Sequence, residues 1–378
     1  MNRNDANTLR LFLGGDVMLG RGIDQILPHP VDPRLYESFM RSALGYVDLA
    51  ERRNGPIPDD LPFSYIWGDL LADLEMRACD LRLINLETAI TRSERPAAKQ
   101  INYRMSPGNI GALTAAGIDI CTLANNHVLD WSEEGLTDTL DSLDRAGIGR
   151  AGAGRSAEEA AQAGVAEVTG KARVLVIAYG SPSAGVPEGW RAGPDRPGVN
   201  LLPDSIDATV SDIHARTDSL KRPGDLLVVS IHWGWNWGYF IPEEQRAIAR
   251  ALIDAGAADL VFGHSSHHPK GIEIHRGKPI LYGAGDLIND YEGITGHEEF
   301  KPDLGLAYIA DVAPGTGKLE RLEMIPYRRH RLSLRRADAQ EAVWLADMLR
   351  RESRLGGMVI TQDAEGSVLL SPEELPGR

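Results

Sequence analysis

The chain has 378 residues, of which 43% are hydrophobic and 25% are charged, and this composition excludes a disordered, collagen-like or coiled-coil protein. With 40 basic and 54 acidic residues the formal net charge is −14, which argues against non-specific binding to nucleic acid or to an anionic membrane. Two cysteines are too few for a disulfide framework, and no run approaches the ~18 apolar residues of a transmembrane segment. We therefore expect a cytoplasmic protein with a sizeable core.

Short apolar runs alternate with amphipathic stretches over most of the chain. The runs at 9–13, 81–84, 118–123, 226–231 and 260–262 are predicted to be strands. The stretches at 65–78, 107–116, 133–146, 205–220 and 242–255 are predicted to be helices, three of which end at a glycine. A repeated strand–helix order predicts a layered α/β fold.

The pattern changes after about residue 270. Residues 271–282 and 304–325 each indicate a hairpin, with turns at 276–277 and 314–317, so the sheets are predicted to be mixed. A terminal helix at 338–352 and a polar tail are expected to follow. The Pro/Gly-rich stretch 180–198 is expected to form a long surface loop near the site.

Polar clusters follow five of the predicted strands. They contain Asp16, Asn85 with Glu87, Asn126 with His127, His232, and His264 with His267 and His268. Because ligands gather at the carboxyl ends of strands in α/β sheets, these side chains are expected to converge. Carboxylate, amide and imidazole donors without cysteine suit Mn²⁺, Fe²⁺ or Zn²⁺. A bridging carboxylate would allow either one ion or two ions ~3.5–4 Å apart.

Each of these residues also has a structural explanation. Asp16 could cap a turn or helix, Glu87 could lie at the surface, and Asn126 could form a turn with its neighbour Asn125. His232 could be a packed histidine in an aromatic corner. Five clusters that all follow strand-like runs favour a shared metal site over five separate caps.

These motifs resemble the CapA family of poly-γ-glutamate capsule biosynthesis proteins, which have a calcineurin-like metallophosphoesterase architecture. The resemblance covers residues 9–310 in order and rests on Gly15-Asp16-Val17-Met18-Leu19-Gly20-Arg21, Asn85-Leu86-Glu87-Thr88, Ala124-Asn125-Asn126-His127, His232-Trp233-Gly234 and Gly263-His264 to Gly271-Ile272-Glu273. It implies a layered metallophosphatase-like fold with mixed sheets flanked by helices. We expect a CapA-like domain at 9–330, followed by a C-terminal helix and polar tail at 331–378.

The resemblance also implies roles for individual residues. It places Asp16, Glu87, Asn126, His232 and His267 at metal-binding positions, with His264 as a further candidate ligand. It places His127 at the position that donates a proton or stabilises negative charge. Two departures stand out. Met18 occupies a position where metallophosphoesterases carry a histidine, and the stretch 263–269 lacks their His-x-His order, so which of its three histidines bind metal stays open.

Further candidates flank these motifs. Arg21, Asn85, Trp233 and Trp235 are candidate substrate-binding residues, and Asp286 and His297 are candidate acid/base groups. The basic run 328–336 is expected to be a solvated face, with anion binding as the alternative.

Three functions remain open. The first is a metal-dependent hydrolase that cleaves a phosphoester or a polyglutamate or peptide amide and is linked to capsule or poly-γ-glutamate biosynthesis. The second is a metal-dependent peptide epimerase, in which His297 or Asp286 acts opposite His127. The third is a non-catalytic polymer-binding accessory subunit. Fold and metal ligands do not choose among them, and a homo-oligomer is also left open.

Overall fold

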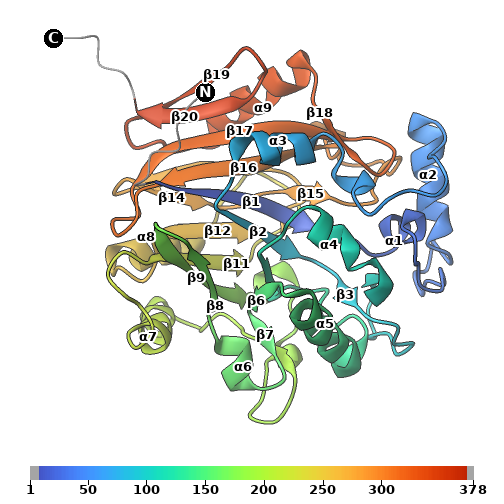
Figure 1. The fold of residues 1–378 in the computed structure, drawn as a ribbon, viewed down its shortest axis with the longest axis horizontal. Coiled ribbons are helices and arrows are strands. Elements are labelled where there is room, and N and C mark those ends of the chain that lie inside the picture. Colours follow the sequence, from blue (N-terminus) through green and yellow to red (C-terminus); the bar gives the residue numbers. More distant parts are fainter. Residues whose placement is uncertain (1–7, 373–378) are drawn as a thin grey trace.

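The computed structural model describes residues 8–372. Two mixed β-sheets form its centre (Figure 1). The first sheet has ten strands in the order β19-β20-β17-β16-β1-β2-β5-β6, with β15 paired to β1 and β18 paired to β17. The second has six strands in the order β13-β14-β12-β11-β9-β8.

The strands of the first sheet are β1 (Leu9–Val17), β2 (Leu81–Leu86), β5 (Ile120–Thr122), β6 (Gly149–Ala151), β15 (Asp286–Ile288), β16 (Leu304–Val312), β17 (Leu319–Arg329), β18 (Leu334–Arg336), β19 (Met358–Gln362) and β20 (Val368–Pro372). Those of the second are β8 (Gly164–Val168), β9 (Ala172–Gly180), β11 (Leu226–His232), β12 (Leu260–His264), β13 (Ile272–His275) and β14 (Lys278–Leu281). Two short pairs join β3 (Ala89–Ile90) to β4 (Arg104–Met105) and β7 (Ala153–Gly154) to β10 (Gly198–Val199). The α-helices are α1 (Gly22–Ile26), α2 (Leu44–Asn54), α3 (Leu70–Arg77), α4 (Gly111–Ala115), α5 (Ser132–Ala146), α6 (Ala157–Ala161), α7 (Ile206–Thr217), α8 (Glu243–Asp254) and α9 (Ala339–Glu352).

Alternation along the strands produces three packed layers of apolar side chains. Leu11 and Leu13 of β1 pack in one cluster with Val228 and Phe262 of the second sheet. Phe12, on the opposite face of β1, packs in a second cluster with residues of α3, α4 and α5. The outer face of the second sheet packs on α7 and α8. Central strands are thus buried on both faces, which explains their continuous apolar runs.

The structure confirms a mixed α/β fold with several sheets. Each predicted strand and helix is present, although two of the helices are divided. The stretch 65–78 divides into a 3₁₀ turn at Tyr65–Trp67 and α3, and 107–116 divides into a 3₁₀ turn at Pro107–Asn109 and α4. Both predicted hairpins are present as antiparallel pairs, β13 with β14 and β16 with β17. Strands β8 and β9 were not predicted, and β9 lies inside the second sheet.

The expectation of a polar tail after α9 was wrong for the described residues. Strands β19 and β20 form an antiparallel hairpin that extends the first sheet beside β17 and lies at its outer edge in Figure 1. Ile360, Val368 and Leu370 are buried there in the same cluster as the inter-sheet core. Each strand has only five residues, three apolar ones followed by two that are polar or proline, so the apolar run is too short to indicate a strand.

The stretch 180–198 is mostly irregular, with 3₁₀ turns at Pro182–Ala184 and Glu188–Trp190. It lies near the predicted site, because the Ser181 amide donates to the carbonyl of His232. Within residues 8–372, no helix is long and apolar enough to span a membrane.

Strand direction brings the predicted site together. Strands β1, β2 and β5 are parallel neighbours in the first sheet, and β11 and β12 are parallel neighbours in the second. Their carboxyl ends carry Asp16, Asn85, His232 and His264. The Ser265 amide, which follows β12, donates to Asp16 at 3.0 Å, so the ends of the two sheets meet.

Candidate metal centre

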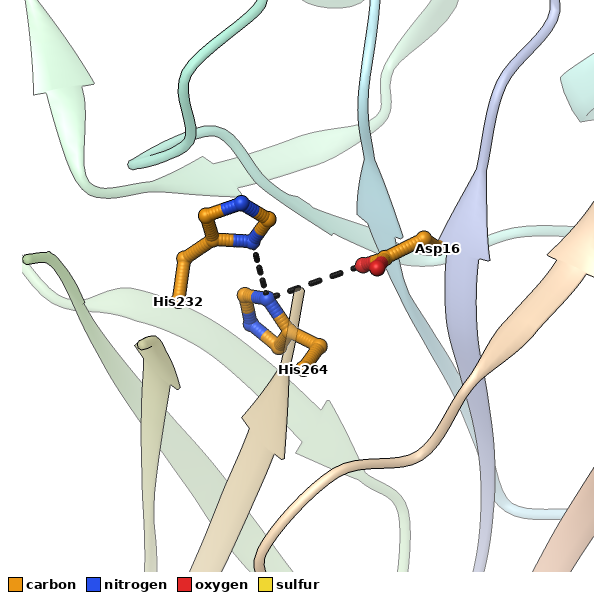
Figure 2. A group of neighbouring side chains, drawn as sticks. All are labelled: Asp16, His232 and His264. Carbon is orange, nitrogen blue, oxygen red and sulfur yellow. Dashed lines mark hydrogen bonds and ion pairs between the residues drawn. The ribbon is translucent and has the colours of Figure 1, made fainter. Parts of the chain in front are cut away.

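Asp16, His232 and His264 form a buried cluster where the two sheets meet (Figure 2). One ligand atom from each lies within 4.8 Å of the others, and none of the three residues is more than 1% exposed. His232 and His264 end β11 and β12 in register, so they share one face. Their Nδ1 atoms are 2.8 Å apart, and His264 Nδ1 is 3.7 Å from Asp16 Oδ1.

Neighbouring groups hold these side chains in orientation. Asn85 Nδ2 donates to Asp16 Oδ1 at 2.7 Å. Ser230 Oγ lies 2.7 Å from His264 Nε2, which leaves His264 Nδ1 directed at the cluster. Outer hydrogen bonds of this kind orient the ligands of metal sites.

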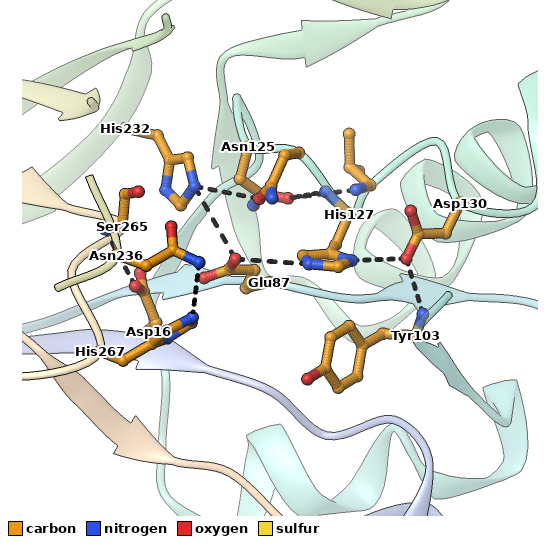
Figure 3. Close-up of polar contacts among 12 residues, drawn as sticks. Asp16, Glu87, Tyr103, Asn125, His127, Asp130, His232, Asn236, Ser265 and His267 are labelled. Carbon is orange, nitrogen blue, oxygen red and sulfur yellow. Dashed lines mark hydrogen bonds and ion pairs between the residues drawn. The ribbon is translucent and has the colours of Figure 1, made fainter. Parts of the chain in front are cut away.

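Glu87 extends the cluster (Figure 3), and Asn126 extends it beside His232. His232 Nε2 lies 3.1 Å from Asn126 Oδ1 and 3.8 Å from Glu87 Oε1. The turn that presents Asn126 is held by the Asn125 side chain, whose Oδ1 accepts the amides of His127 and Val128. Glu87 Oε2 is buried and has no hydrogen-bond partner among the described residues.

The electrostatics of the cluster favour a cation. Burial, together with the nearby carboxylate of Asp286, raises the pKa of Asp16 and of Glu87. Burial lowers the pKa of His232, and that of His264 to about 3. Within residues 8–372, no Lys or Arg nitrogen contacts either carboxylate. A divalent ion would supply the missing charge, and neutral imidazoles with carboxylate and amide oxygens suit Mn²⁺, Fe²⁺ or Zn²⁺.

His127 lies on the other side of Glu87, with its Nε2 3.8 Å from Glu87 Oε1. Its Nδ1 is 2.6 Å from Asp130 Oδ2, so we assign the proton to Nδ1 and the lone pair to Nε2. Lys99 Nζ lies 2.7 Å from Asp130 Oδ1. Burial lowers the pKa of His127 to about 4, which makes it neutral and able to accept a proton at Nε2.

Residues 10–291 match the family described as bacterial capsule synthesis protein PGA_cap. The chain belongs to this family. It is 49% identical over 361 residues, 95% of each chain, to a probable polyglutamine synthesis accessory protein of Mycobacterium tuberculosis (strain H37Rv). It is also 28% identical over 216 residues to the PGA biosynthesis protein CapA of Bacillus subtilis, and 29% over 200 residues to the capsule biosynthesis protein CapA of Bacillus anthracis. These two matches cover 57% and 53% of this chain and 54% and 47% of the relatives.

In this PGA_cap member, the candidate substrate-binding residues occupy different surroundings. Arg21 is buried and pairs with Glu37 and Asp290. Trp233 is 2% exposed, and its indole donates to the Tyr282 carbonyl. Trp235 is 62% exposed. Arg21 and Trp233 therefore lie in packed surroundings, and Asn85 holds Asp16.

The two candidate acid/base groups are separated. The His297 ring stacks on Trp237, with 3.9 Å between their centroids, and contacts none of the cluster residues named above. Asp286 is 1% exposed and lies beside His267, next to Asp16. In the basic run, Arg329 is buried rather than solvated and donates to backbone carbonyls.

Sequence reasoning missed several residues of the candidate site. Asp130 follows His127 by three residues, a spacing that places a carboxylate within reach of the imidazole and could have been noticed. Lys99, Ser230 and Asn236 belong to none of the recognised motifs. Only the fold brings them to the histidines or to their carboxylate partner.

The unpartnered oxygen of Glu87 leads to a stability prediction. In metal-free protein at pH 8, Glu87→Gln is expected to raise Tm by a few degrees, because a buried unsatisfied charged group costs roughly 1–3 kcal/mol. The pKa of Glu87 is raised in the folded protein, so folding disfavours ionisation. The difference in Tm between Glu87→Gln and wild type should therefore grow from pH 5 to pH 8.

Thermal melts in EDTA and in Mn²⁺ would measure this effect. Added Mn²⁺ should reverse the order, because the wild type gains a ligand that the variant lacks. The control is Glu75→Gln, which changes an exposed glutamate and should shift neither melt. A variant that is less stable than wild type in EDTA at pH 8 would contradict the prediction.

Proposed function

We propose that this chain is a metal-dependent hydrolase that acts in polyglutamate or capsule synthesis, on a layered fold of the calcineurin-like metallophosphoesterase type. The observation that carries the proposal is the buried convergence of Asp16, His232 and His264 beside the unpartnered oxygen of Glu87. The names of the relatives, which refer to polyglutamine synthesis, PGA biosynthesis and capsule biosynthesis, support the substrate class.

Asp16, Glu87, Asn126, His232 and His264 would hold one or two ions. When bound, the metal supplies Lewis acidity toward a carbonyl or phosphoryl oxygen and toward water. His127 would accept at Nε2 the proton of the water that attacks the substrate, and Asp130 would stabilise the imidazolium through Nδ1. The same proton then passes from Nε2 to the departing nitrogen or oxygen.

The distance between His127 and Glu87 supports this role. The two groups are separated by 3.8 Å, so the proton-transfer atom lies next to the carboxylate that would hold the ion. A substrate bond placed over the two groups would be within reach of both the metal ligands and the proton acceptor.

A second candidate is an accessory protein that binds polymer without cleaving it. The word "accessory" in the names of the Mycobacterium tuberculosis relatives favours it. In this case the metal would hold a carboxylate of the polymer, and His127 would have no proton to transfer.

The test is to incubate Mn²⁺-loaded protein with p-nitrophenyl phosphate or with oligo-γ-glutamate in D₂O. Release of nitrophenol or of primary amine, lost in His127→Ala, would support hydrolysis. Deuterium uptake at Cα without cleavage would replace hydrolysis by epimerisation. Binding of the oligomer to the protein without cleavage and without deuterium uptake would support the accessory role.

A further inference from the structure

A second histidine–carboxylate pair lies beside the centre, and the proposed mechanism gives it no task. His267 Nδ1 is 3.1 Å from both carboxylate oxygens of Asp286. Asp286 is 1% exposed, and Asn289 Nδ2 donates to its Oδ2 at 2.7 Å. Both oxygens of Asp286 are therefore engaged inside the protein.

These contacts assign the proton on the His267 ring. A carboxylate that faces Nδ1 requires a hydrogen on that nitrogen. At the other end of the ring, Nε2 lies 3.1 Å from the side-chain amide of the exposed residue Asn236 (Figure 3), which can donate to it. The Nε2 lone pair thus points away from Asp286, and an ion bound there would replace the Asn236 contact.

The fold holds Asp286 in place. Strand β15 pairs with β1 so that Asp286 lies opposite Asp16. The buried guanidinium of Arg329 donates to the Asp286 carbonyl. The ring of Tyr291 packs edge-on against His267, with 5.3 Å between their centroids. Carboxylate and imidazole are therefore both held in position by the protein itself.

We propose that Asp286 is a positioning residue that orients His267 so that its Nε2 binds a metal ion beside Asp16. Metal-binding histidines usually donate their other ring N–H to such an acceptor. This inference rests on the proposed metal-dependent function, and it chooses His267 over His268. The His268 ring stacks with Phe300, and its Nδ1 faces the Pro269 carbonyl.

The proposal also separates Asp286 from proton transfer. Its oxygens are bound to His267 and Asn289, so it acts through His267 and not on the substrate. Removing Asp286 should consequently weaken metal binding, and it should do so only while His267 is present.

The experiment compares Mn²⁺ binding to wild type, Asp286→Ala, Asp286→Asn, His267→Ala and the double variant, by calorimetry and by the Mn²⁺ electron paramagnetic resonance signal. Asp286→Ala should weaken the affinity for one Mn²⁺ ion by about 10–100-fold. Asp286→Asn, which keeps an acceptor oxygen, should bind more tightly than Asp286→Ala. The double variant should bind no more weakly than His267→Ala alone.

Asp254→Ala is the matched control, because it removes a carboxylate that contacts His275 Nε2 at 2.8 Å away from the centre. It should bind Mn²⁺ like wild type, and circular dichroism in EDTA should show every variant folded. Unchanged Mn²⁺ binding by Asp286→Ala would overturn this inference but not the metal-dependent function. The same holds if the double variant binds Mn²⁺ more weakly than His267→Ala. No Mn²⁺ binding by wild type would overturn the metal-dependent function as well.

Discussion

Replacing His232 by alanine is expected to abolish stoichiometric metal binding. His232 contacts both parts of the centre, because Nδ1 faces His264 and Nε2 faces Asn126 and Glu87. Its loss should therefore cost more than the roughly 10–100-fold in affinity that outer-shell changes cost. Elemental analysis after growth with added Mn²⁺, Fe²⁺ and Zn²⁺ would measure it, with one to two equivalents expected in wild type.

The same variant should lose the stabilisation that the metal gives. A ligand present at 100 times its Kd adds about 2.7 kcal/mol to the free energy of unfolding, so the wild type should melt higher with metal than in EDTA, and His232→Ala should not. The control is His275→Ala, which removes a partly exposed histidine paired with Asp254 and should keep its metal. Retention of a full metal complement by folded His232→Ala would refute the assignment of this centre.

Replacing His127 by alanine is expected to reduce turnover by about 10²–10⁴-fold, the usual contribution of a positioned acid/base group. Metal content should stay at the wild-type level, because the contacts of His127 run to Asp130, Lys99 and Tyr103 rather than to the cluster histidines. Rate measurements on whichever substrate is cleaved, beside elemental analysis of the same samples, would check both expectations.

Asp130→Asn provides the companion variant. It keeps a hydrogen-bond acceptor for Nδ1 but removes the charge that stabilises the imidazolium, so its rate should lie between wild type and His127→Ala. Full activity of metal-loaded His127→Ala would show that this histidine transfers no proton, and the accessory role would then be favoured.

The sequence by itself determined the order and type of most elements and the family. Continuous apolar runs of strand length such as 226–231 are typical of a strand buried on both faces, which this one is. Motifs that follow such runs lie at the carboxyl ends of strands, so the strand pattern groups Asp16 with Asn85 on neighbouring parallel strands. His232 lies in the other sheet, and only the meeting of the two sheets brings it to Asp16. Apolar runs of only three residues, as in 358–362, carried too little signal to be recognised as strands.

Only the tertiary structure decided which atoms meet. The pairing of β15 with β1 brings Asp286 to Asp16 across 270 residues of sequence, and a loop carries Lys99 to Asp130. The structure also placed Arg21 in a buried ion pair and Trp233 in the core. Contacts of this kind depend on strand register and loop path, which are set by packing over the whole chain and leave no local pattern in the residues that form them.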